Sequence, residues 1–406
     1  MASAGFKLEL APPETLGRRF QLALLSLDPG LYTLNATAGY AAFTSPDDYV
    51  ELVEEALGAL RALESESPRK CKPTQVAGID CCKLHRGPKL YTAGASDYTL
   101  LRSAGFTRCA YSTSTGKESI AWSHAAVSYA AMVLDSGGPL GGAAKGLPWL
   151  AKSTVFGKVR VAGGGRQAGG RRSGSQVSLD TLGSVLLGGA IAFLWSQRVG
   201  RDNLEFYLVP DAVHRGYAAL RELMVGRGLR DGVAYRAARL ASELPVSIEV
   251  ALALALAVEL AEHYKPAREL AAYTEVEELE RAATVVTVTP QQRPMVRSTI
   301  PLTSILYAAY DGTTLREVLA LAWASRGAPR GLEGLRDAVG GCINAMFLQA
   351  MHARDSDHLS GCIRSLAALA DAAHRRGLRE WESRLGRLAW RLARDYLEMA
   401  RGVAGH

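Results

Sequence analysis

The sequence lacks any apolar run long enough to cross a membrane. The longest apolar-rich stretches are Leu182–Trp195 and Val250–Val258, and both are shorter than the ~20 residues that a transmembrane helix needs. The N-terminus also lacks the basic and then apolar layout of a secretory signal peptide. We therefore expect a soluble, cytoplasmic protein without a membrane partner.

Side-chain amides are scarce, with three asparagines and eight glutamines among 406 residues, and arginine outnumbers lysine by 37 to 10. Few thermolabile amides and many guanidinium groups are typical of proteins from organisms that live at high temperature. This expectation bears on the six cysteines, because intracellular disulfides occur in hyperthermophiles although they are rare in ordinary cytosol.

Motifs for catalysis or nucleotide binding are absent from the chain. The segment Ser114–Lys117 ends in Gly-Lys but is followed by Glu118, so it fails as a P-loop, and the run Gly163–Gly165 leads into no Gly-Lys-Ser/Thr. No His-Glu-x-x-His and no Ser/His/Asp order is present. The sequence therefore predicts no catalytic residues and no enzyme activity.

Acidic residues are missing from one long segment, 136–179, which we call the Gly-rich basic segment. Its 44 residues contain no Asp or Glu, twelve glycines and seven basic residues. Since the net charge of the chain is +7, the whole positive excess lies there, and the rest balances at 40 basic and 40 acidic residues. The seven are Lys145, Lys152, Lys158, Arg160, Arg166, Arg171 and Arg172.

The Gly-rich basic segment has two interpretations. Spaced basic residues attract phosphates, and glycines let backbone amides approach a ligand closely, which predicts nucleic-acid binding. The alternative is a solvated insertion whose charge only aids solubility. Complete segregation of the net charge favours binding. Only Thr154–Ala162 alternates like a strand, so we expect a long mobile loop or a β-hairpin.

A region rich in cysteine carries a second, smaller basic cluster between Arg69 and Lys89. Tetrahedral zinc sites favour thiolate and imidazole ligands, but the spacing here contains no Cys-x-x-Cys pair. A structural zinc site, disulfides such as Cys71 to Cys109, and buried thiols therefore stay open as interpretations. The candidate ligands are Cys71, Cys81, Cys82, His85 and Cys109.

The pattern of apolar residues predicts an α+β fold with four regions. An N-terminal α/β region (1–135) precedes the Gly-rich basic segment (136–179), a middle α/β region (180–300) and a C-terminal helical bundle (301–406). Cys342 and Cys362 fall on consecutive helices of the bundle. A disulfide between them and a pair of core thiols are equally open.

Individual elements follow from periodicity and punctuation. We expect a strand or hairpin over Leu31–Phe43, helices over 46–60 and 120–134, and strands over 204–210 and 284–289. We also expect a buried helix over 179–197, a helix over 211–225, two helices divided at Pro266, a connector over 290–297, and bundle helices over 302–325, 332–353, 356–376 and 378–401.

The last helix has an arginine face beside its apolar stripe. The arginines recur at spacings of three, four and three residues, and Glu380 and Glu398 lie on the same side, within reach of ion pairs. A solvated ion-pair face is favoured, and a secondary nucleic-acid strip is the alternative. The row comprises Arg384, Arg387, Arg391 and Arg394.

The order of these parts resembles a known family. An α/β N-terminal part, a basic Gly-rich insertion, the run Phe-Tyr-Leu-Val-Pro at 206–210 and a C-terminal helical bundle occur together. The chain resembles the large subunit of archaeal type I-A CRISPR–Cas interference (Cascade) complexes.

The resemblance implies a subunit without nuclease activity in an RNA-guided complex. Its partners would be the double-stranded DNA target, the guide RNA, the other complex subunits and a helicase–nuclease. It would recognise the motif that flanks the target and aid strand separation, while sequence is read by guide pairing. Carried over to this chain, the loop from Lys145 to Arg172 would contact DNA. Some members carry a four-cysteine zinc site, with which the irregular spacing here does not agree.

Two other classes of function compete with this interpretation. One is a metal-dependent enzyme that uses the cysteine and histidine residues of 71–109, with the Gly-rich basic segment as a lid. The other is a scaffold protein that docks its partners through that segment.

Overall fold

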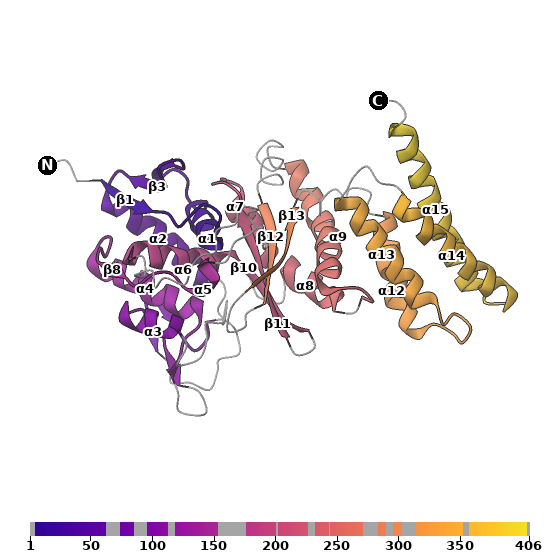
Figure 1. Ribbon diagram of the computed structural model, residues 1–406, viewed down its shortest axis with the longest axis horizontal. Coiled ribbons are helices and arrows are strands. Elements are labelled where there is room, and N and C mark those ends of the chain that lie inside the picture. The colour runs from indigo at the N-terminus through magenta and orange to yellow at the C-terminus, as the bar shows by residue number, and fades with distance from the viewer. Residues whose placement is uncertain are drawn as a thin grey trace, which may run out of the picture. The chain divides into compact units, whose positions relative to one another are not determined.

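The chain contains both helices and strands and has a helical C-terminal region, which confirms a mixed α+β fold (Figure 1). This computed structural model describes residues 5–61, 74–84, 96–112, 118–152, 176–199, 202–225, 232–242, 244–270, 283–289, 295–302, 313–351 and 357–403. Among its helices within these ranges, none is both long and apolar enough to span a bilayer.

The chain divides into two compact units. Unit 1 comprises Met1–Gly232 and Glu277–Thr299, and unit 2 comprises Val233–Val276 and Ile300–His406. This division differs from the four regions expected from the sequence. Residues from both sides of the Gly-rich basic segment share the core of unit 1, and 233–276 belongs with the C-terminal helices.

The N-terminal half of unit 1 is built from helices and short strands. They are β1 (Phe6–Glu9), α1 (Leu16–Leu25), β2 (Tyr32–Asn35), β3 (Tyr40–Phe43), α2 (Pro46–Arg61), β4 (Gln75–Val76), β5 (Ile79–Asp80), α3 (Ser96–Ser103), β6 (Tyr111–Ser112), β7 (Glu118–Ser119) and α4 (Trp122–Ser136). The expected hairpin is present as β2 and β3, and β1 pairs with β3 to complete an antiparallel sheet.

The rest of unit 1 comprises β8 (Ala143–Ala144), α5 (Trp149–Lys152), β9 (Val177–Ser178), α6 (Leu179–Ala192), β10 (Phe193–Val199), β11 (Asp202–Pro210), α7 (Tyr217–Val225), β12 (Ala283–Thr289) and β13 (Met295–Pro301). The strands β10 to β13 form a four-stranded sheet in that order. The expected strands over 204–210 and 284–289 are confirmed as β11 and β12.

Helix α2 begins where the sequence predicts. The amide of Asp48 donates to Ser45 Oγ at 3.2 Å, and the amide of Ser45 donates to the Asp48 carboxylate at 2.8 Å. This reciprocal capping satisfies two amides at the helix start. The predicted apolar face is buried, and it consists of Tyr49, Leu52, Val53, Ala56, Leu57 and Leu60.

Helix α6 is the central helix of unit 1 and is buried along its length. It packs against α1, α2 and α4. Three glycines permit this packing, because a Cβ at Gly183 would meet the Tyr129 ring, one at Gly188 the backbone of Phe20, and one at Gly189 the Trp122 ring.

The expected helix over 179–197 is too long. Helix α6 ends at Ala192, and Phe193 opens strand β10, which pairs with Tyr207 of β11. In a continuous apolar run such as this one, hydrophobic periodicity cannot distinguish a buried helix from a buried strand. Pairing with β11 therefore decides the outcome, and only the tertiary fold supplies that partner.

Other boundaries also differ from the predictions. Helix α7 begins at Tyr217 instead of at 211, because the amides of His214 and Gly216 donate to Ser26 Oγ and to His214 Nδ1. Strand β13 occupies part of the expected connector, of which 290–294 lie outside the described residues.

Unit 2 consists of helices α8 (Val233–Ala241), α9 (Ile248–Leu270), α12 (Thr313–Ala324), α13 (Leu335–Met351), α14 (Asp357–Arg375) and α15 (Arg379–Val403), with the 3-10 turn η1 (Ser325–Gly327). Helix α9 continues through Pro266, where a break was expected. A proline removes one backbone hydrogen bond and bends a helix without always ending it. In Figure 1, α14 and α15 run side by side, and they are in contact.

Candidate nucleic-acid interface

The predicted basic residues fall largely outside the described part of the chain. Lys145, after β8, and Lys152, at the end of α5, are both exposed. The remaining five, Lys158, Arg160, Arg166, Arg171 and Arg172, lie within 153–175, outside the described residues.

The base of the Gly-rich basic segment is described on both sides. Strand β8 pairs with β9, so that Ala143 opposes Ser178 and Ala144 opposes Val177. Between these strands, α5 packs against α1 with Leu150 and Ala151 buried, so the described chain stays in the core of unit 1 as far as α5. Five of the seven basic residues lie between α5 and β9, and all seven lie between these paired strands.

A buried carboxylate supports this base. Asp180, in the first turn of α6, accepts hydrogen bonds from the amides of Leu140 and Gly141 at 3.0 Å and from the Tyr129 hydroxyl at 2.9 Å. The hydroxyls of Tyr129 and Tyr49 lie 2.5 Å apart. A carboxylate with three donors at a helix N-terminus is well compensated although it is buried. Asp180 therefore ties α4, the 138–142 turn and α6 together.

Burial disfavours ionisation of both tyrosines of this network. It is the main reason why the pKa of Tyr129 and the pKa of Tyr49 are raised well above their usual range, and the Asp180 carboxylate adds to both shifts. A protonated hydroxyl can donate a hydrogen bond to Asp180, as the geometry requires. These groups act as structural supports of the segment's base.

Three of the five candidate metal ligands are disulfide-bonded. Cys81 and Cys109 are joined to each other, and Cys82 is also in a disulfide. The pairing differs from the suggested Cys71 to Cys109 bridge. Cys71 and His85 lie outside the described residues. Within the described ranges, no group of three or more His, Cys, Asp or Glu side chains is placed to hold a metal ion.

Of the two interpretations of Cys342 and Cys362, the structure contains the disulfide. It joins α13 to α14, with the two Cα atoms 4.8 Å apart.

The arginine row of α15 borders a groove with α12. Arg391 forms an ion pair with Glu317 of α12, and Thr314 of α12 donates to Asp395 of α15 at 2.8 Å. Further along the two helices, a groove is lined by Glu317, Ala320 and Leu321 of α12 and by Arg384, Arg387 and Leu388 of α15. We call this feature the α12–α15 groove.

The groove keeps an excess of positive charge. Arg391 and Arg394 have carboxylate partners in Glu317 and Asp395. Among the residues that the structure describes, neither Arg384 nor Arg387 has a carboxylate partner. The sequence favoured an ion-pair face, and the described contacts satisfy only half of this row.

The two helices that form the groove also carry exposed tryptophans. Trp390 is 63% exposed and Trp323 is 49% exposed. Trp390 follows Arg387 by three residues on α15, and Trp323 follows Ala320 by three residues on α12, so each lies beside a groove residue. Guanidinium carbons lie over these rings, Arg394 at 5.6 Å from the Trp390 centroid and Arg326 at 5.3 Å from that of Trp323.

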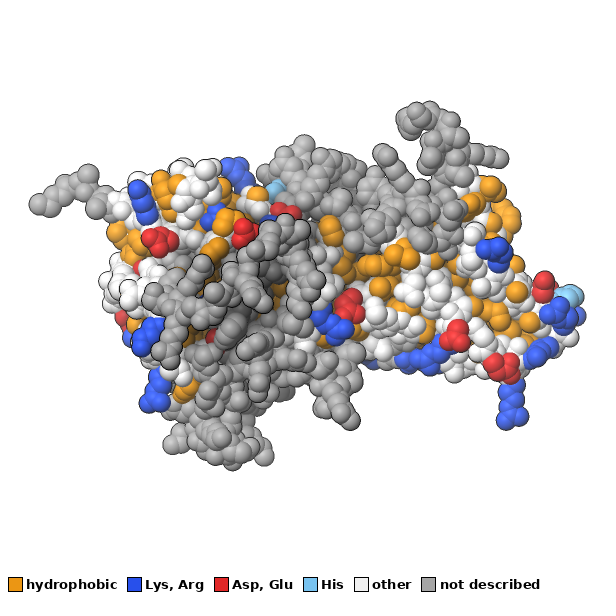
Figure 2. All heavy atoms as spheres, in the orientation of Figure 1, with side chains coloured by type: hydrophobic (Ala, Val, Ile, Leu, Met, Phe, Trp, Pro, Cys, Tyr) orange, Lys and Arg blue, Asp and Glu red, His pale blue; other side chains and the backbone are white. Residues whose placement is uncertain are grey.

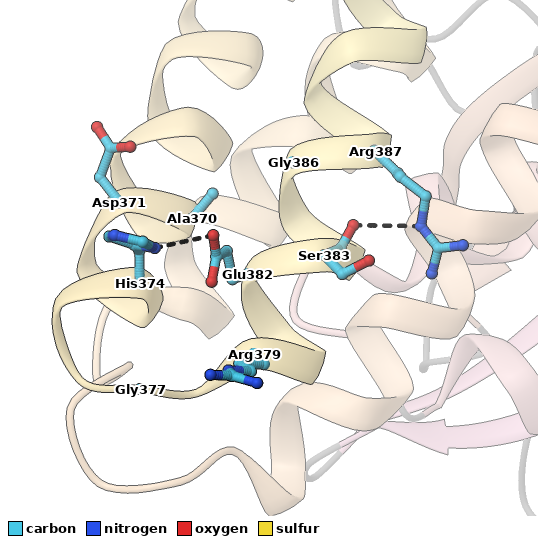
Figure 3. A pocket seen from close by; sticks show the side chains of 9 residues that line it. All are labelled: Ala370, Asp371, His374, Gly377, Arg379, Glu382, Ser383, Gly386 and Arg387. Carbon is cyan, nitrogen blue, oxygen red and sulfur yellow. Dashed lines mark hydrogen bonds and ion pairs between the residues drawn. The ribbon is translucent and has the colours of Figure 1, made fainter.

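A second hollow lies between α14 and α15 (Figure 3). There His374 Nδ1 and Glu382 Oε1 are 2.9 Å apart, and their side chains point towards each other, whereas Arg387 points away. Asp371 and Arg379 also line this hollow. Its acidic and basic side chains nearly balance, so it offers less attraction to phosphate than the α12–α15 groove.

Sequence analysis found the arginine row but not its aromatic neighbours. Trp390 lies opposite the apolar stripe that contains Leu388 and Leu392, and this position on a helical wheel signals exposure. Trp323 gives no such signal, because its neighbours on α12 are apolar in sequence. Figure 2 shows hydrophobic side chains beside basic ones over the described surface of unit 2.

Comparison of the chain with models of protein families, with curated proteins and with solved structures gives no match.

Proposed function

We propose that this chain is a nucleic-acid-binding protein that acts by binding instead of by catalysis. The Gly-rich basic segment supplies the contact, through phosphates. The observation that carries the proposal is that all seven charges of the positive excess lie between the paired strands β8 and β9. A segment with so many basic residues and no acidic residue attracts the phosphates of a nucleic acid, whatever its base sequence.

The base of the segment is tied to the core of unit 1 at both ends. The Asp180 hydrogen bonds and the β8–β9 pairing hold both ends of the segment on unit 1. Fixed ends reduce the conformational entropy that a loop loses when it binds.

From the family resemblance, we propose a role within an RNA-guided CRISPR interference complex. The chain would be a large subunit that recognises DNA flanking the target and aids strand separation, together with guide RNA, other subunits and a helicase–nuclease. Guide RNA that co-purifies with the chain from its native host would support this role. Purification of the chain free of RNA and of other subunits would contradict it.

The metal-dependent enzyme is the weaker alternative. Thiolates bind zinc, whereas a cysteine in a disulfide has no thiolate to offer. Cys81, Cys82 and Cys109 are all disulfide-bonded.

The test is duplex binding by the full-length chain at several salt concentrations. Seven contacts to B-form phosphates would give a log–log slope of about −6, and half that slope is expected because a glycine-rich loop seldom engages every charge at once. Replacing five residues by alanine should weaken binding and flatten the slope together. They are Lys158, Arg160, Arg166, Arg171 and Arg172.

A matched control removes five exposed arginines from unit 2: Arg239, Arg330, Arg336, Arg364 and Arg375. This variant changes the net charge equally and should retain the wild-type slope. Equal slopes for the wild type and the segment variant would contradict the proposal.

One outcome would refine the mode of binding. If a segment arginine reads a base, its replacement should cost about 1–3 kcal/mol on one duplex sequence and little on others. Uniform losses across sequences indicate phosphate contacts alone.

A further inference from the structure

The α12–α15 groove combines two features that the proposed function does not use. Its arginines include two without a carboxylate partner among the described residues, Arg384 and Arg387. The two helices that form it also carry Trp323, on α12, and Trp390, on α15, two of the four large hydrophobic side chains that are exposed in the described chain. The Gly-rich basic segment belongs to unit 1, whereas this groove belongs to unit 2.

Both tryptophans present large apolar faces to solvent. Side chains of this size are usually covered, and exposed ones mark contact sites more often when polar groups surround them. Here a guanidinium lies over each ring, Arg394 over Trp390 and Arg326 over Trp323. The same pattern recurs within α15, where Arg384 lies 5.9 Å from the centroid of Trp381.

Interleaved aromatic and basic side chains suit one polymer in particular. Single-stranded nucleic acid exposes unpaired base faces that stack on aromatic rings, and its phosphates pair with arginines. A duplex offers no free base faces, because its bases are stacked on one another. The arginine row from Arg384 to Arg394 extends over roughly 15 Å at 1.5 Å per residue, so it can follow a backbone over several phosphates.

We propose that the α12–α15 groove is a binding site for single-stranded nucleic acid. Trp390 and Trp323 stack bases, and Arg384 and Arg387 pair with phosphates. This site goes beyond the phosphate contacts proposed for unit 1, because it selects unpaired strands.

The apolar neighbours fit a protein ligand less well. Leu397 and Leu348 are also exposed, but an apolar protein helix would gain nothing from Arg384 and Arg387 and would have to desolvate them. Unpaired bases use the rings and the charges together.

The test uses the full-length chain and two labelled ligands, a 20-nucleotide oligothymidylate and a 20-base-pair duplex, followed by fluorescence anisotropy. Replacing both tryptophans, Trp323→Ala with Trp390→Ala, should weaken oligothymidylate binding about fivefold or more. Duplex binding should be unchanged. Trp390→Phe should recover most of the affinity lost on replacing Trp390, because phenylalanine also stacks.

A charge-matched pair isolates the arginines. Arg384→Ala with Arg387→Ala should weaken oligothymidylate binding, whereas Arg336→Ala with Arg364→Ala, at exposed positions on α13 and α14, should not. Equal losses in the two pairs would overturn the proposal, because the effect would then be one of net charge.

A readout on the wild type does not depend on the folding of any variant. Oligothymidylate should quench the intrinsic tryptophan fluorescence of the chain, and Trp390→Phe should reduce that quenching. Failure of the wild type to bind oligothymidylate at low salt, or an unchanged affinity after both tryptophans are replaced, would overturn the proposal. A protein partner whose binding is lost with Leu397→Ala, and which oligothymidylate does not displace, would also overturn it.

The two proposals fail separately. The variant that lacks five basic residues of the Gly-rich basic segment tests duplex binding and its salt slope. The tryptophan variant tests binding of the single strand. Loss of one activity in either variant without the other identifies which proposal stands.

Discussion

Gly188 shows how one residue decides a helix packing. A Cβ built on it would lie 1.8 Å from the carbonyl oxygen of Phe20 in α1, and a backbone atom cannot rotate away as a side chain can. We predict that Gly188→Ala lowers the free energy of unfolding by about 1–3 kcal/mol or more. Urea unfolding followed by circular dichroism measures this loss.

Gly58 provides the matched control. It lies in helix α2, and a Cβ there would meet nothing within 4 Å. Gly58→Ala should therefore stabilise the chain by roughly 0.5–1 kcal/mol, from the lower entropy of alanine in the unfolded state. If both variants shift stability in the same direction, steric contact at Gly188 is not the cause.

Buried tyrosines predict alkaline instability. Burial raises the pKa of Tyr49, Tyr129, Tyr32 and Tyr217 in the folded chain above the ordinary value of about 10. The folded state therefore favours the protonated form, so its advantage is complete below pH 10 and is lost as the pH rises above it. Each such tyrosine lowers the free energy of unfolding by up to about 1.4 kcal/mol for every pH unit in that range.

Replacing one of these tyrosines isolates its contribution. Tyr49→Phe should cost about 1 kcal/mol at neutral pH, because the hydrogen bond between the Tyr49 and Tyr129 hydroxyls is lost. Above pH 10 its stability should fall less steeply than that of the wild type. Urea unfolding between pH 8 and pH 11 measures both effects, and parallel curves for the two proteins would contradict the assignment.

At the scale of elements, the disulfide between α13 and α14 contributes to the stability of the fold by an amount that can be calculated. Cys342 and Cys362 are separated by 20 residues, and closing a loop of that length limits the unfolded chain by about 3 kcal/mol. We predict that Cys342→Ala with Cys362→Ala lowers the free energy of unfolding by about 2–4 kcal/mol. Both positions are buried, so we choose alanine instead of serine, whose hydroxyl would be buried without a hydrogen-bond partner.

The measurement is denaturant unfolding under oxidising and reducing conditions. Reductant should destabilise the helices of unit 2 in the wild type and should have no such effect on them in the double variant. An unchanged unfolding midpoint of the oxidised double variant would show that the bridge constrains the unfolded chain little.

Single elements also show where sequence patterns reach their limit. The apolar stripe and the capping residues of α2 are local, so the sequence predicted its start and its buried face. The switch from α6 to β10 at Phe193 depends on pairing with β11, and no local pattern contains that partner.

For the whole molecule, two cores imply two unfolding events. Unit 1 and unit 2 each form a compact set of contacts, and units with separate cores often unfold separately. We predict that calorimetry resolves two transitions. Gly188→Ala should lower one of them, and the Cys342 and Cys362 double variant should lower the other. One transition displaced by both variants would show that the units unfold together.

The candidate site was predictable in part. The seven basic residues and the arginine row follow from charge alone, since charge patterns need no fold to be counted. Their neighbours needed three dimensions. The role of Asp180 follows from the amides of Leu140 and Gly141 that donate to it in the fold. Trp323 becomes a candidate residue because α12 packs against α15.

The sequence by itself determined the mixed α+β composition, the helical C-terminal region, the buried face of α2 and the segregation of the positive charge, because each depends on residues close together in the chain. Tertiary structure alone decided the division into two units, the pairing of Cys81 with Cys109, and the place where β8 and β9 meet. These features join residues that are distant in sequence. Such contacts form because buried area and hydrogen bonds across the fold outweigh the entropy of closing the loops between them.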